Sequence, residues 1–246
     1  MIRLEQVTKI YSTGGTELRA LDGVSLEIER GEFLAIMGQS GSGKSTMMNI
    51  IGMLDRPTRG SYLFSEQDVS QLDDRARARL RGSTFGFVFQ SYSLLPRLSA
   101  LEQVELPLIY QGVRDRRRRA AEALVRVGLA QRIGHRPTEL SGGEQQRVAI
   151  ARSLVVDPLV VLADEPTGAL DTATGHEVME LLSDLVDRHG LTVILVTHEQ
   201  EVADYAHRTI RMRDGRITED SGPALPPVTP EDGVTASIDD TEQTTA

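Results

Sequence analysis

A glycine-rich segment followed by lysine and serine is the part of this sequence whose residue types most clearly predict a chemistry. It covers residues 38–45 and reads Gly-Gln-Ser-Gly-Ser-Gly-Lys-Ser. Glycines let a backbone wrap closely around an anion, so that its amide N–H groups point inward, and a helix that begins there adds its positive end. The segment therefore predicts a phosphate-binding loop with the candidate residues Gly38, Ser40, Gly41, Ser42, Gly43, Lys44, Ser45 and Thr46.

Lysine is scarce in this chain, which makes the lysine of the loop informative. Of the 27 basic residues only Lys9 and Lys44 are lysine, so the remaining 25 are arginine. An ammonium is a compact point charge that fits between phosphates, whereas a planar guanidinium fits there poorly. We expect Lys44 to reach the outer phosphates of a nucleotide and the Ser45 hydroxyl to ligate Mg²⁺.

Two neighbouring carboxylates follow another apolar segment, residues 159–163. An acid at the end of a strand beside a phosphate loop suits a Mg²⁺ partner, usually through water. We interpret Asp164 as the residue that organises the metal and Glu165 as the general base that polarises an attacking water. The alternative is a strand followed by ordinary solvated acids.

A third candidate site is the start of a predicted helix at Ser141-Gly142-Gly143. Ser141 is placed to cap the helix, and the two glycines leave its first turn without side chains. Bare amides, a hydroxyl and the helix dipole together form an anion site. A chain with one phosphate loop and a separate anion-binding helix end suggests that the two meet across a dimer. A well-capped structural helix is the alternative.

Three apolar segments are expected to position these residues as strands buried on both faces, namely residues 33–37, 159–163 and 192–196. Each is followed by polar or glycine-rich residues and then by a helical pattern. This order predicts an α/β domain with a mostly parallel sheet. Ligands of such folds bind beyond the carboxyl ends of the strands, and all three segments end in chemically suggestive residues.

Other segments predict an antiparallel β-layer and a helical region. Residues 2–7 and 24–29 alternate apolar and polar, as half-exposed strands do, and Asp214-Gly215 predicts a hairpin turn within residues 210–217. Residues from about 91 to 156 have a helical pattern, with capping boxes that begin at Ser99 and Ser141. Pro107 is expected to end or kink the first of these helices.

Composition limits the function further. The chain has 246 residues and no cysteine, which excludes disulfides, thiolate metal sites and a cysteine nucleophile. It has no apolar run near 18 residues and no apolar leader at its start, so the cytoplasm is the expected location. The net charge is −9, but no Lys or Arg follows Arg216, and the segment from residue 222 to 246 is acidic and predicted to be disordered.

These motifs, taken together and in this order, resemble the ATP-binding cassette family. They are the phosphate loop, Leu-Ser-Gly-Gly-Glu-Gln-Gln-Arg at residues 140–147 and Ala-Asp-Glu-Pro-Thr-Gly-Ala-Leu-Asp at residues 163–171. Residues 49–58 and 105–109 are most similar to cassettes of the MacB, LolD and FtsE type. The resemblance implies a phosphate-loop NTPase core with a mostly parallel sheet, an antiparallel β-subdomain and an inserted helical subdomain. It places the ATP-binding domain at residues 1–221 and the helical subdomain at about 91–156.

The resemblance also implies roles for four further residues. Tyr11 matches the aromatic residue that stacks on adenine, although no sequence neighbour fixes its orientation. Gln90 matches the glutamine that touches Mg²⁺ and the attacking water, and His198 matches the switch histidine that contacts the γ-phosphate. Asp171 matches the loop that crosses the dimer interface, and it can also cap the helix that follows.

Two positions depart from the family pattern. Gln39 stands in the loop where relatives often have proline, and Glu199 stands where aspartate is common. Neither residue is expected to contact the chemistry directly. No residue that the family needs for hydrolysis is replaced, so we expect an active ATPase.

The function implied by the resemblance is that of a motor subunit at the cytoplasmic face of the cell membrane. It would hydrolyse ATP with Mg²⁺, form a homodimer on ATP binding and drive an FtsX-like or MacB-like permease for export, lipoprotein or peptide extrusion, or mechanotransmission. The alternative is a soluble cassette ATPase acting on nucleic acid or ribosomes. Two arginine-rich stretches, residues 75–81 and 114–119, admit nucleic-acid binding, a solvated helix face or contact with a membrane subunit, and we expect no nucleic acid.

Overall fold

The computed structural model describes residues 1–13 and 16–222. The acidic tail predicted from residue 222 onward therefore lies outside the described residues, apart from Gly222. Within the described residues, no helix combines the length and the apolar character that crossing a bilayer requires.

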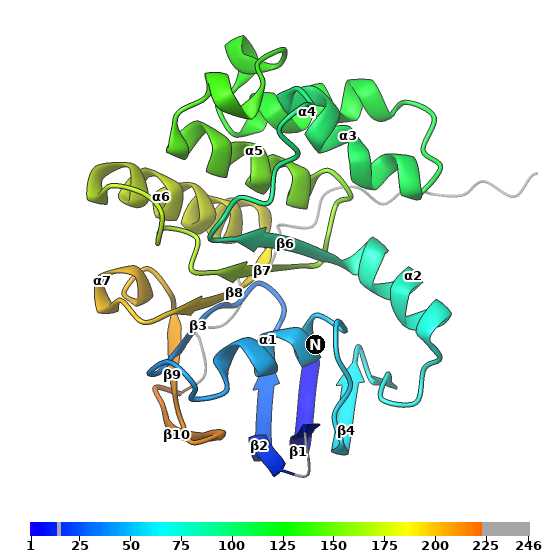
Figure 1. Cartoon of the computed structure of the whole chain (residues 1–246), viewed down its shortest axis with the longest axis vertical. Coiled ribbons are helices and arrows are strands. Elements are labelled where there is room, and N and C mark those ends of the chain that lie inside the picture. Colours follow the sequence, from blue (N-terminus) through cyan, green and yellow to red (C-terminus); the bar gives the residue numbers. More distant parts are fainter. Residues whose placement is uncertain (14–15, 223–246) are drawn as a thin grey trace, which may run out of the picture.

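A mostly parallel sheet forms the middle layer of the molecule (Figure 1). Its strand order is β10-β9-β3-β8-β7-β6. The bounds are β3 Phe33–Met37, β6 Phe85–Phe89, β7 Val160–Asp164, β8 Thr192–Thr197, β9 Arg208–Arg213 and β10 Arg216–Asp220. The three predicted parallel strands are β3, β8 and β7, which lie side by side. The α/β class is therefore confirmed.

Two of the three predicted parallel strands have different bounds in the structure: β8 extends one residue further, to Thr197, and β7 is shifted by one residue. Strand β7 begins at Val160 rather than at Leu159, because Leu159 is 40% exposed and donates its N–H to Thr84 outside the parallel ladder. As a result Asp164 is the last residue of the strand, and Glu165 is the first residue beyond it.

A second, antiparallel sheet lies on one side of the first, as the alternating segments predict (Figure 1). Its order is β2-β1-β4-β5, with bounds β1 Ile2–Thr13, β2 Thr16–Ile28, β4 Arg59–Phe64 and β5 Gln67–Asp68. Helix α1, Lys44–Ile51, packs between the two sheets. The predicted hairpin joins β9 and β10, and both turn residues, Asp214 and Gly215, have the positive φ that a tight hairpin turn requires.

The other face of the parallel sheet is covered by helices (Figure 1). Their bounds are α3 Ala100–Tyr110, α4 Arg116–Arg126, α5 Gly142–Leu154, α6 Thr172–His189 and α7 Gln200–Ala203, with short 3-10 turns η1 Ala130–Arg132 and η2 Pro137–Glu139. Helix α2, Asp74–Thr84, instead packs through Leu80 against the core on the side of α1 and the antiparallel sheet. The capping boxes predicted at Ser99 and Ser141 are both present. The region between residues 91 and 156 is mainly helical, as the pattern predicts.

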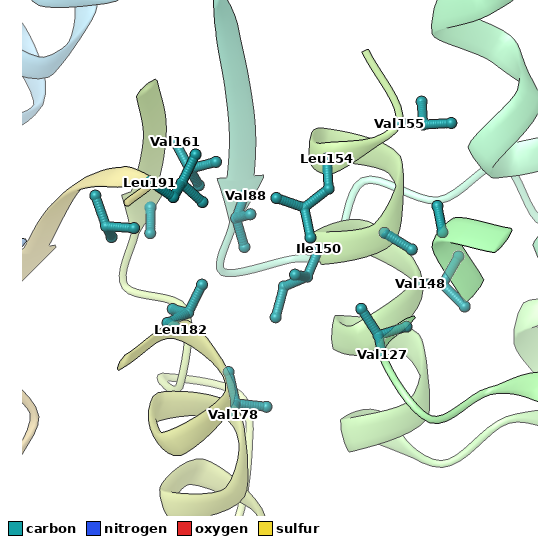
Figure 2. Close-up of a cluster of buried hydrophobic side chains, with 14 of the residues drawn as sticks. Val88, Val127, Val148, Ile150, Leu154, Val155, Val161, Val178, Leu182 and Leu191 are labelled. Atoms are coloured by element: carbon teal, nitrogen blue, oxygen red, sulfur yellow. The ribbon is translucent and has the colours of Figure 1, made fainter. Parts of the chain in front are cut away.

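The strands divide their side chains between two cores. Leu34 and Ile36 of β3 face α1 and the antiparallel sheet, whereas Phe33, Ala35 and Met37 face the helical layer. Because every second residue of a strand faces the same side, one continuous apolar run serves both cores. Figure 2 shows the helical side, where Ile150 and Leu154 of α5 approach Val88 and Val161 of the sheet. Helix α5, which begins with the Ser141-Gly142-Gly143 motif, is thus packed directly on the sheet.

Of the two outcomes expected at Pro107, an end or a kink of the helix, the structure rules out the first. Helix α3 runs through Pro107 to Tyr110. Proline removes one N–H from the helix ladder, but Val104 and Leu108 are fully buried on either side of it. The Pro107 carbonyl also accepts the N–H of Gln111, so the last turn closes normally. Packing of the apolar face therefore outweighs the local preference to stop.

Candidate functional site

The predicted phosphate loop has a backbone that only glycine adopts easily. Gly38, Gly41 and Gly43 all have positive φ, between 82° and 152°. A Cβ on Gly38 would lie 2.4 Å from the Met212 carbonyl, and one on Gly43 would lie 2.5 Å from the Ala20 carbonyl. The loop is therefore pressed against β2 and β9, and it lies between β3 and the start of α1 as the sequence predicts.

The lysine of the loop is held over the loop's own backbone. Its ammonium donates hydrogen bonds to the carbonyls of Gly38 at 2.7 Å and Gln39 at 3.0 Å, and Lys44 is only 8% exposed. Gln39 takes part in this arrangement through its backbone carbonyl. Helix α1 begins after Gly43 without a side-chain cap and without an acid in its first turn. This helix end can accept an anion.

The β9–β10 hairpin supports the loop from the side. Gly215 donates its N–H to the Ser42 carbonyl at 3.0 Å, and its own carbonyl accepts the N–H of Asp22 at 2.9 Å. The hairpin turn thus ties β2 to the phosphate loop. The loop is therefore held by a residue far from it in the sequence.

Glu165 and His198 meet beyond the ends of β7 and β8. His198 Nδ1 and Glu165 Oε1 are joined by a hydrogen bond of 2.9 Å. Glu165 has a φ of +46°, which is costly for a residue with a side chain and is typical of functional sites. Its N–H donates to the Val196 carbonyl at 2.9 Å. The backbone turn therefore directs the Glu165 side chain away from the strand and toward His198.

Asp164 precedes this turn and is partly buried. Burial raises the pKa of its carboxyl, and the neighbouring Glu165 charge raises it further, while the Lys44 charge opposes both. A cation near Asp164 would relieve the cost of its ionised form. The Asp164 carboxylate, the Ser45 hydroxyl and the Gln90 amide oxygen are hard oxygen donors of the kind that Mg²⁺ prefers. These donor types therefore suit this metal.

A cavity of about 990 Å³ brings many of the predicted residues together. We call it the phosphate-loop cavity. Its lining includes the predicted residues Tyr11, Gly38, Ser40, Gly41, Gly43, Lys44, Ser45, Thr46, Glu165 and His198. The lining combines an aromatic ring, a phosphate-type loop and a carboxylate paired with an imidazole. These are groups that suit the base, the phosphates and the reacting end of a nucleotide.

The remaining candidates lie outside this cavity. Ser42 is buried within the loop. Gln90 packs against the segment after Glu165, because a Cβ on Gly168 would lie 2.6 Å from its Nε2. The hydroxyl of Tyr92, two residues further on, donates to the Ala169 carbonyl at 3.3 Å. Gln90 thus stands where the sheet passes into the helical layer.

Ser141, Gly142, Gly143 and Asp171 form a second group, which we call the signature end. Ser141 Oγ accepts the N–H of Glu144 at 3.2 Å, and Glu144 accepts the N–H of Ser141 at 2.8 Å. Asp171 accepts the N–H of Thr174 at 3.1 Å and its hydroxyl at 2.7 Å, so it caps α6. A Cβ on Gly143 would lie 2.3 Å from Cγ2 of Thr174. The starts of α5 and α6 are therefore packed closely side by side.

Tyr11 has a partner that the sequence did not reveal. Its hydroxyl donates to Asp55 Oδ2 at 2.8 Å. This partner lies 44 positions away, so no neighbouring residue in the sequence could indicate it. Leu18, Arg19, Arg211 and Asp214 also line the phosphate-loop cavity and were missed. They belong to β2 and the β9–β10 hairpin, and no local motif marks them.

A phosphate-type loop between a buried parallel strand and a helix, with carboxylates beyond the next strands, defines a nucleotide-binding ATPase of the phosphate-loop class. The comparisons with known proteins narrow this class. The sequence profile described as ABC transporter matches residues 21–168. The chain belongs to the ABC transporter family, as one of its ATP-hydrolysing cassettes.

Individual relatives have the same character. The chain is 55% identical over 224 residues to a macrolide export ATP-binding/permease protein MacB from Hyphomonas neptunium, covering 90% of this chain and 35% of that protein. It is 54% identical over 219 residues to an uncharacterized ABC transporter ATP-binding protein from Thermotoga maritima, covering 88% of this chain and 93% of that protein. The chain thus spans about a third of the length of the MacB relatives and nearly all of the second relative.

Solved structures agree with the fold. A dimeric bacterial ABC transporter cassette superposes with a TM-score of 0.82 at 47% identity, covering 90% of this chain and 98% of that one. A dimeric post-hydrolysis state of such a cassette, bound to ADP and Pi, gives a TM-score of 0.82 at 46% identity with the same coverage.

Proposed function

We propose that the chain is the ATP-driven motor of an ABC-type membrane complex, in which two copies enclose two ATP molecules. Each ATP would lie in the phosphate-loop cavity of one copy and be covered by the signature end of the other. The observation that carries this proposal is the phosphate-loop cavity, because Tyr11, the glycine loop and the Glu165–His198 pair all line the same cavity. Residues 1–221 would form the ATP-binding domain, with a helical subdomain at about 91–156.

The residues of the cavity would divide the chemistry among them. Tyr11 would stack on the adenine, and the loop amides with Lys44 would hold the phosphates. Ser45, Gln90 and Asp164 would hold Mg²⁺, which supplies charge neutralisation at the outer phosphates. Glu165 would take a proton from the attacking water while the oxygen of that water bonds to the γ-phosphorus. The bond to the ADP oxygen would then break, giving ADP and phosphate.

His198 would keep this carboxylate in position. Its Nδ1 is occupied by Glu165 Oε1, so its Nε2 remains to face the γ-phosphate across the same cavity. The positive φ of Glu165 costs about 1–3 kcal/mol and aims the side chain. Catalysis of this kind is mainly positioning and charge stabilisation, and the rigid turn after β7 provides the positioning.

The signature end supports the dimer part of the proposal. Ser141 is exposed and lies outside the lining of the phosphate-loop cavity. The start of α5 is a capped, glycine-rich helix end with amides that favour an anion. A second copy would bring this end to the open side of the cavity. Asp171 would lie at the same interface while it caps α6.

A groove of about 920 Å³ is the feature that supports the proposal of a membrane partner. It lies between α2, β6, α3 and α5, and its lining includes Leu106, Pro107, Phe89 and the 89% exposed Tyr110. An exposed apolar groove of this kind marks an interaction site. Gln90 directly follows β6, so a segment of a permease seated in the groove would lie close to a residue of the ATP site. We propose that an FtsX-like or MacB-like permease occupies it at the cytoplasmic face of the membrane.

The kind of work that the motor performs is proposed from its relatives. Proteins named for macrolide export are similar to this chain over a third of their length. We propose export, lipoprotein or peptide extrusion, or mechanotransmission as the work done. The arginine-rich stretches fit a solvated and partner-facing surface, because Arg116, Arg118 and Arg119 pair with acids of this chain, while Arg75 and Arg79 line the groove.

The variant Glu165→Gln tests the proposal. It keeps the shape of the side chain but removes the base, so we expect ATP turnover to fall by about 10²–10⁴-fold with ATP affinity retained. ATP should then trap a dimer, seen by sedimentation velocity, and affinity capture from detergent-solubilised membranes should recover an integral membrane protein.

Glu199→Gln is the matched control, since Glu199 lies outside the lining of the cavity, and its turnover should stay normal. Normal turnover in Glu165→Gln would contradict the role of Glu165. A monomer that persists with bound ATP would contradict the dimer, and recovery of nucleic acid or ribosomal proteins instead of a membrane protein would favour the soluble alternative.

A further inference from the structure

The second lysine of this arginine-rich chain lies in an irregular part of strand β1. The pairing of β1 with β2 shifts register between Val7 and Lys9 and again between Lys9 and Ile10. Such bulges redirect a side chain and are common beside active sites. Lys9 is therefore placed by two irregularities rather than by a regular ladder, and Tyr11 follows two residues later on the same strand.

The ammonium of Lys9 has three neighbours. It donates to Asp55 Oδ1 at 2.6 Å and to the Arg56 carbonyl at 2.9 Å. It also lies over the Tyr11 ring, 4.9 Å from the ring centroid. The side chain of Lys9 is only 13% exposed and that of Asp55 is 29% exposed, so water screens this pair weakly compared with a surface ion pair.

Asp55 completes the arrangement from the far end of helix α1. Its Oδ2 accepts the Tyr11 hydroxyl at 2.8 Å, while its Oδ1 accepts Lys9. Its own N–H donates to the Asn49 carbonyl at 3.1 Å. Burial acts to raise the pKa of the Asp55 carboxyl, but the bonds from Lys9, the Arg56 amide and Tyr11 outweigh it and lower that pKa. Asp55 is therefore an anion that binds both the Lys9 ammonium and the Tyr11 hydroxyl.

This geometry sets the orientation of the Tyr11 ring. The hydroxyl is tied to Asp55, and one ring face is covered by the Lys9 ammonium. Tyr11 lines the phosphate-loop cavity, whereas Lys9 and Asp55 lie outside its lining. The same helix α1 carries the phosphate loop at its start and the Asp55 anchor beyond its end. Helix α1 and the turn that follows it therefore connect the phosphate loop to the residue that orients the ring.

We propose that Lys9 and Asp55 are positioning residues that hold Tyr11 as the platform on which the nucleobase stacks. This inference rests on the proposed function in one respect, the assignment of Tyr11 to the base. The compact ammonium also explains why lysine is kept here, since it reaches Asp55, a backbone carbonyl and a ring face at once. A cation on one face of an aromatic ring and a base on the other is a favourable arrangement.

The test compares ATP with inorganic tripolyphosphate, which has the phosphates but no base, by calorimetry in the presence of Mg²⁺. We expect Asp55→Asn and Lys9→Met to raise the Kd for ATP by about 3- to 10-fold, and to leave the Kd for tripolyphosphate unchanged. Tyr11→Phe, which keeps the ring and removes the hydroxyl that bonds to Asp55, should show the same selective loss. Arg3→Met is the matched control, because Arg3 forms an exposed ion pair with Glu27 on the same strand pair.

Three outcomes decide the matter. A selective loss of ATP affinity in Asp55→Asn, Lys9→Met and Tyr11→Phe supports the positioning role. Equal losses for both ligands, or no loss for either, overturn it, since a purely structural role would not change the ratio of the two Kd values. Tyr11→Ala tests the proposed function separately from the positioning role. We expect its affinity for ATP to fall by about 10-fold or more. An unchanged affinity for ATP in this variant would contradict the assignment of Tyr11 to the nucleobase.

Discussion

The phosphate-loop cavity and the signature end are both built at the start of a glycine-rich helix, yet they differ in almost every physical respect. Helix α1 begins without a side-chain cap and without an acid in its first turn, inside a cavity of about 990 Å³. Helix α5 begins at the exposed Ser141, with a complete capping box and Glu144 in its first turn. One helix end is open to an anion within its own chain, whereas the other is already partly satisfied and faces outward.

Glycine serves a different purpose in each place. Gly38 and Gly43 need glycine because their φ is positive and a Cβ would collide with backbone. Gly142 and Gly143 lie in helical backbone and need it for close approach, since a Cβ on Gly143 would lie 2.3 Å from Thr174. The first pair shapes a loop and the second allows two helix starts to touch. The same residue type therefore indicates a loop conformation in one motif and packing in the other.

The largest expected effect comes from breaking the phosphate-loop cavity. Lys44→Met removes the one ammonium that lines this cavity, and we expect the Kd for ATP to rise by about 10²-fold, because charge-assisted hydrogen bonds to phosphate are lost. Calorimetry on the isolated chain measures this directly. Arg3→Met serves again as the control, and ATP affinity within about twofold of the unchanged protein in Lys44→Met would contradict the assignment of the loop.

A smaller effect is expected at the signature end, where binding should survive. Ser141→Ala removes the α5 cap, and Ser99→Ala removes the matching capping box of α3. Each should lower the free energy of unfolding by about 1 kcal/mol. Only Ser141→Ala should also lower ATP turnover, by about 10-fold, because the loss of one hydrogen bond to an anion costs roughly 1.5 kcal/mol.

The pair of variants separates a structural cap from a functional one. Thermal unfolding gives the stability and a phosphate-release assay gives the turnover. Equal turnover in Ser141→Ala and Ser99→Ala would leave α5 as a well-capped structural helix, which is the alternative that its sequence admits. ATP affinity of the single chain should be unchanged in both, in contrast to Lys44→Met.

Sequence reasoning predicted the parts of this molecule that short segments determine. The phosphate loop, the capping boxes at Ser99 and Ser141 and the hairpin at Asp214-Gly215 each depend on residues within about eight positions. The failures depend on distant contacts. Asp55 reaches Tyr11 across 44 positions, and α3 continues past Pro107 because Val104 and Leu108 are buried.

The residues of the candidate site show the same division between local motifs and distant contacts. Residues of the phosphate-loop cavity that belong to motifs were predicted, whereas Arg19 and Arg211 line it only because β2 and the β9–β10 hairpin fold against the loop. No periodicity or motif marks such a residue in a single sequence. Tertiary packing, which decides these positions, is not encoded in any local pattern.

The smallest expected effect concerns the charge of Glu144 at the start of α5. Bonds from the Ser141 backbone and then from Arg132 lower the pKa of Glu144, against a smaller opposing effect of burial. A carboxyl whose pKa is lower in the folded state stabilises the fold above its ordinary pKa, and that contribution is lost as the pH falls through the folded pKa. Glu144→Gln keeps the shape of the capping box but removes the charge. Its free energy of unfolding at pH 7 should fall by about 0.5 kcal/mol.

The variant's disadvantage should disappear as the pH is lowered below about 4, the ordinary range of a glutamate, and thermal unfolding across pH 7 to 3 measures this. Glu102→Gln changes the equivalent residue of the α3 capping box, whose pKa the Ser99 backbone likewise lowers, so it should follow the same pH trend. Only Glu144→Gln should also strengthen the ATP-dependent dimer, because one negative charge near the incoming phosphate is removed. Equal dimer affinity in the two variants would mean that the start of α5 does not approach the phosphates of the partner copy's ATP.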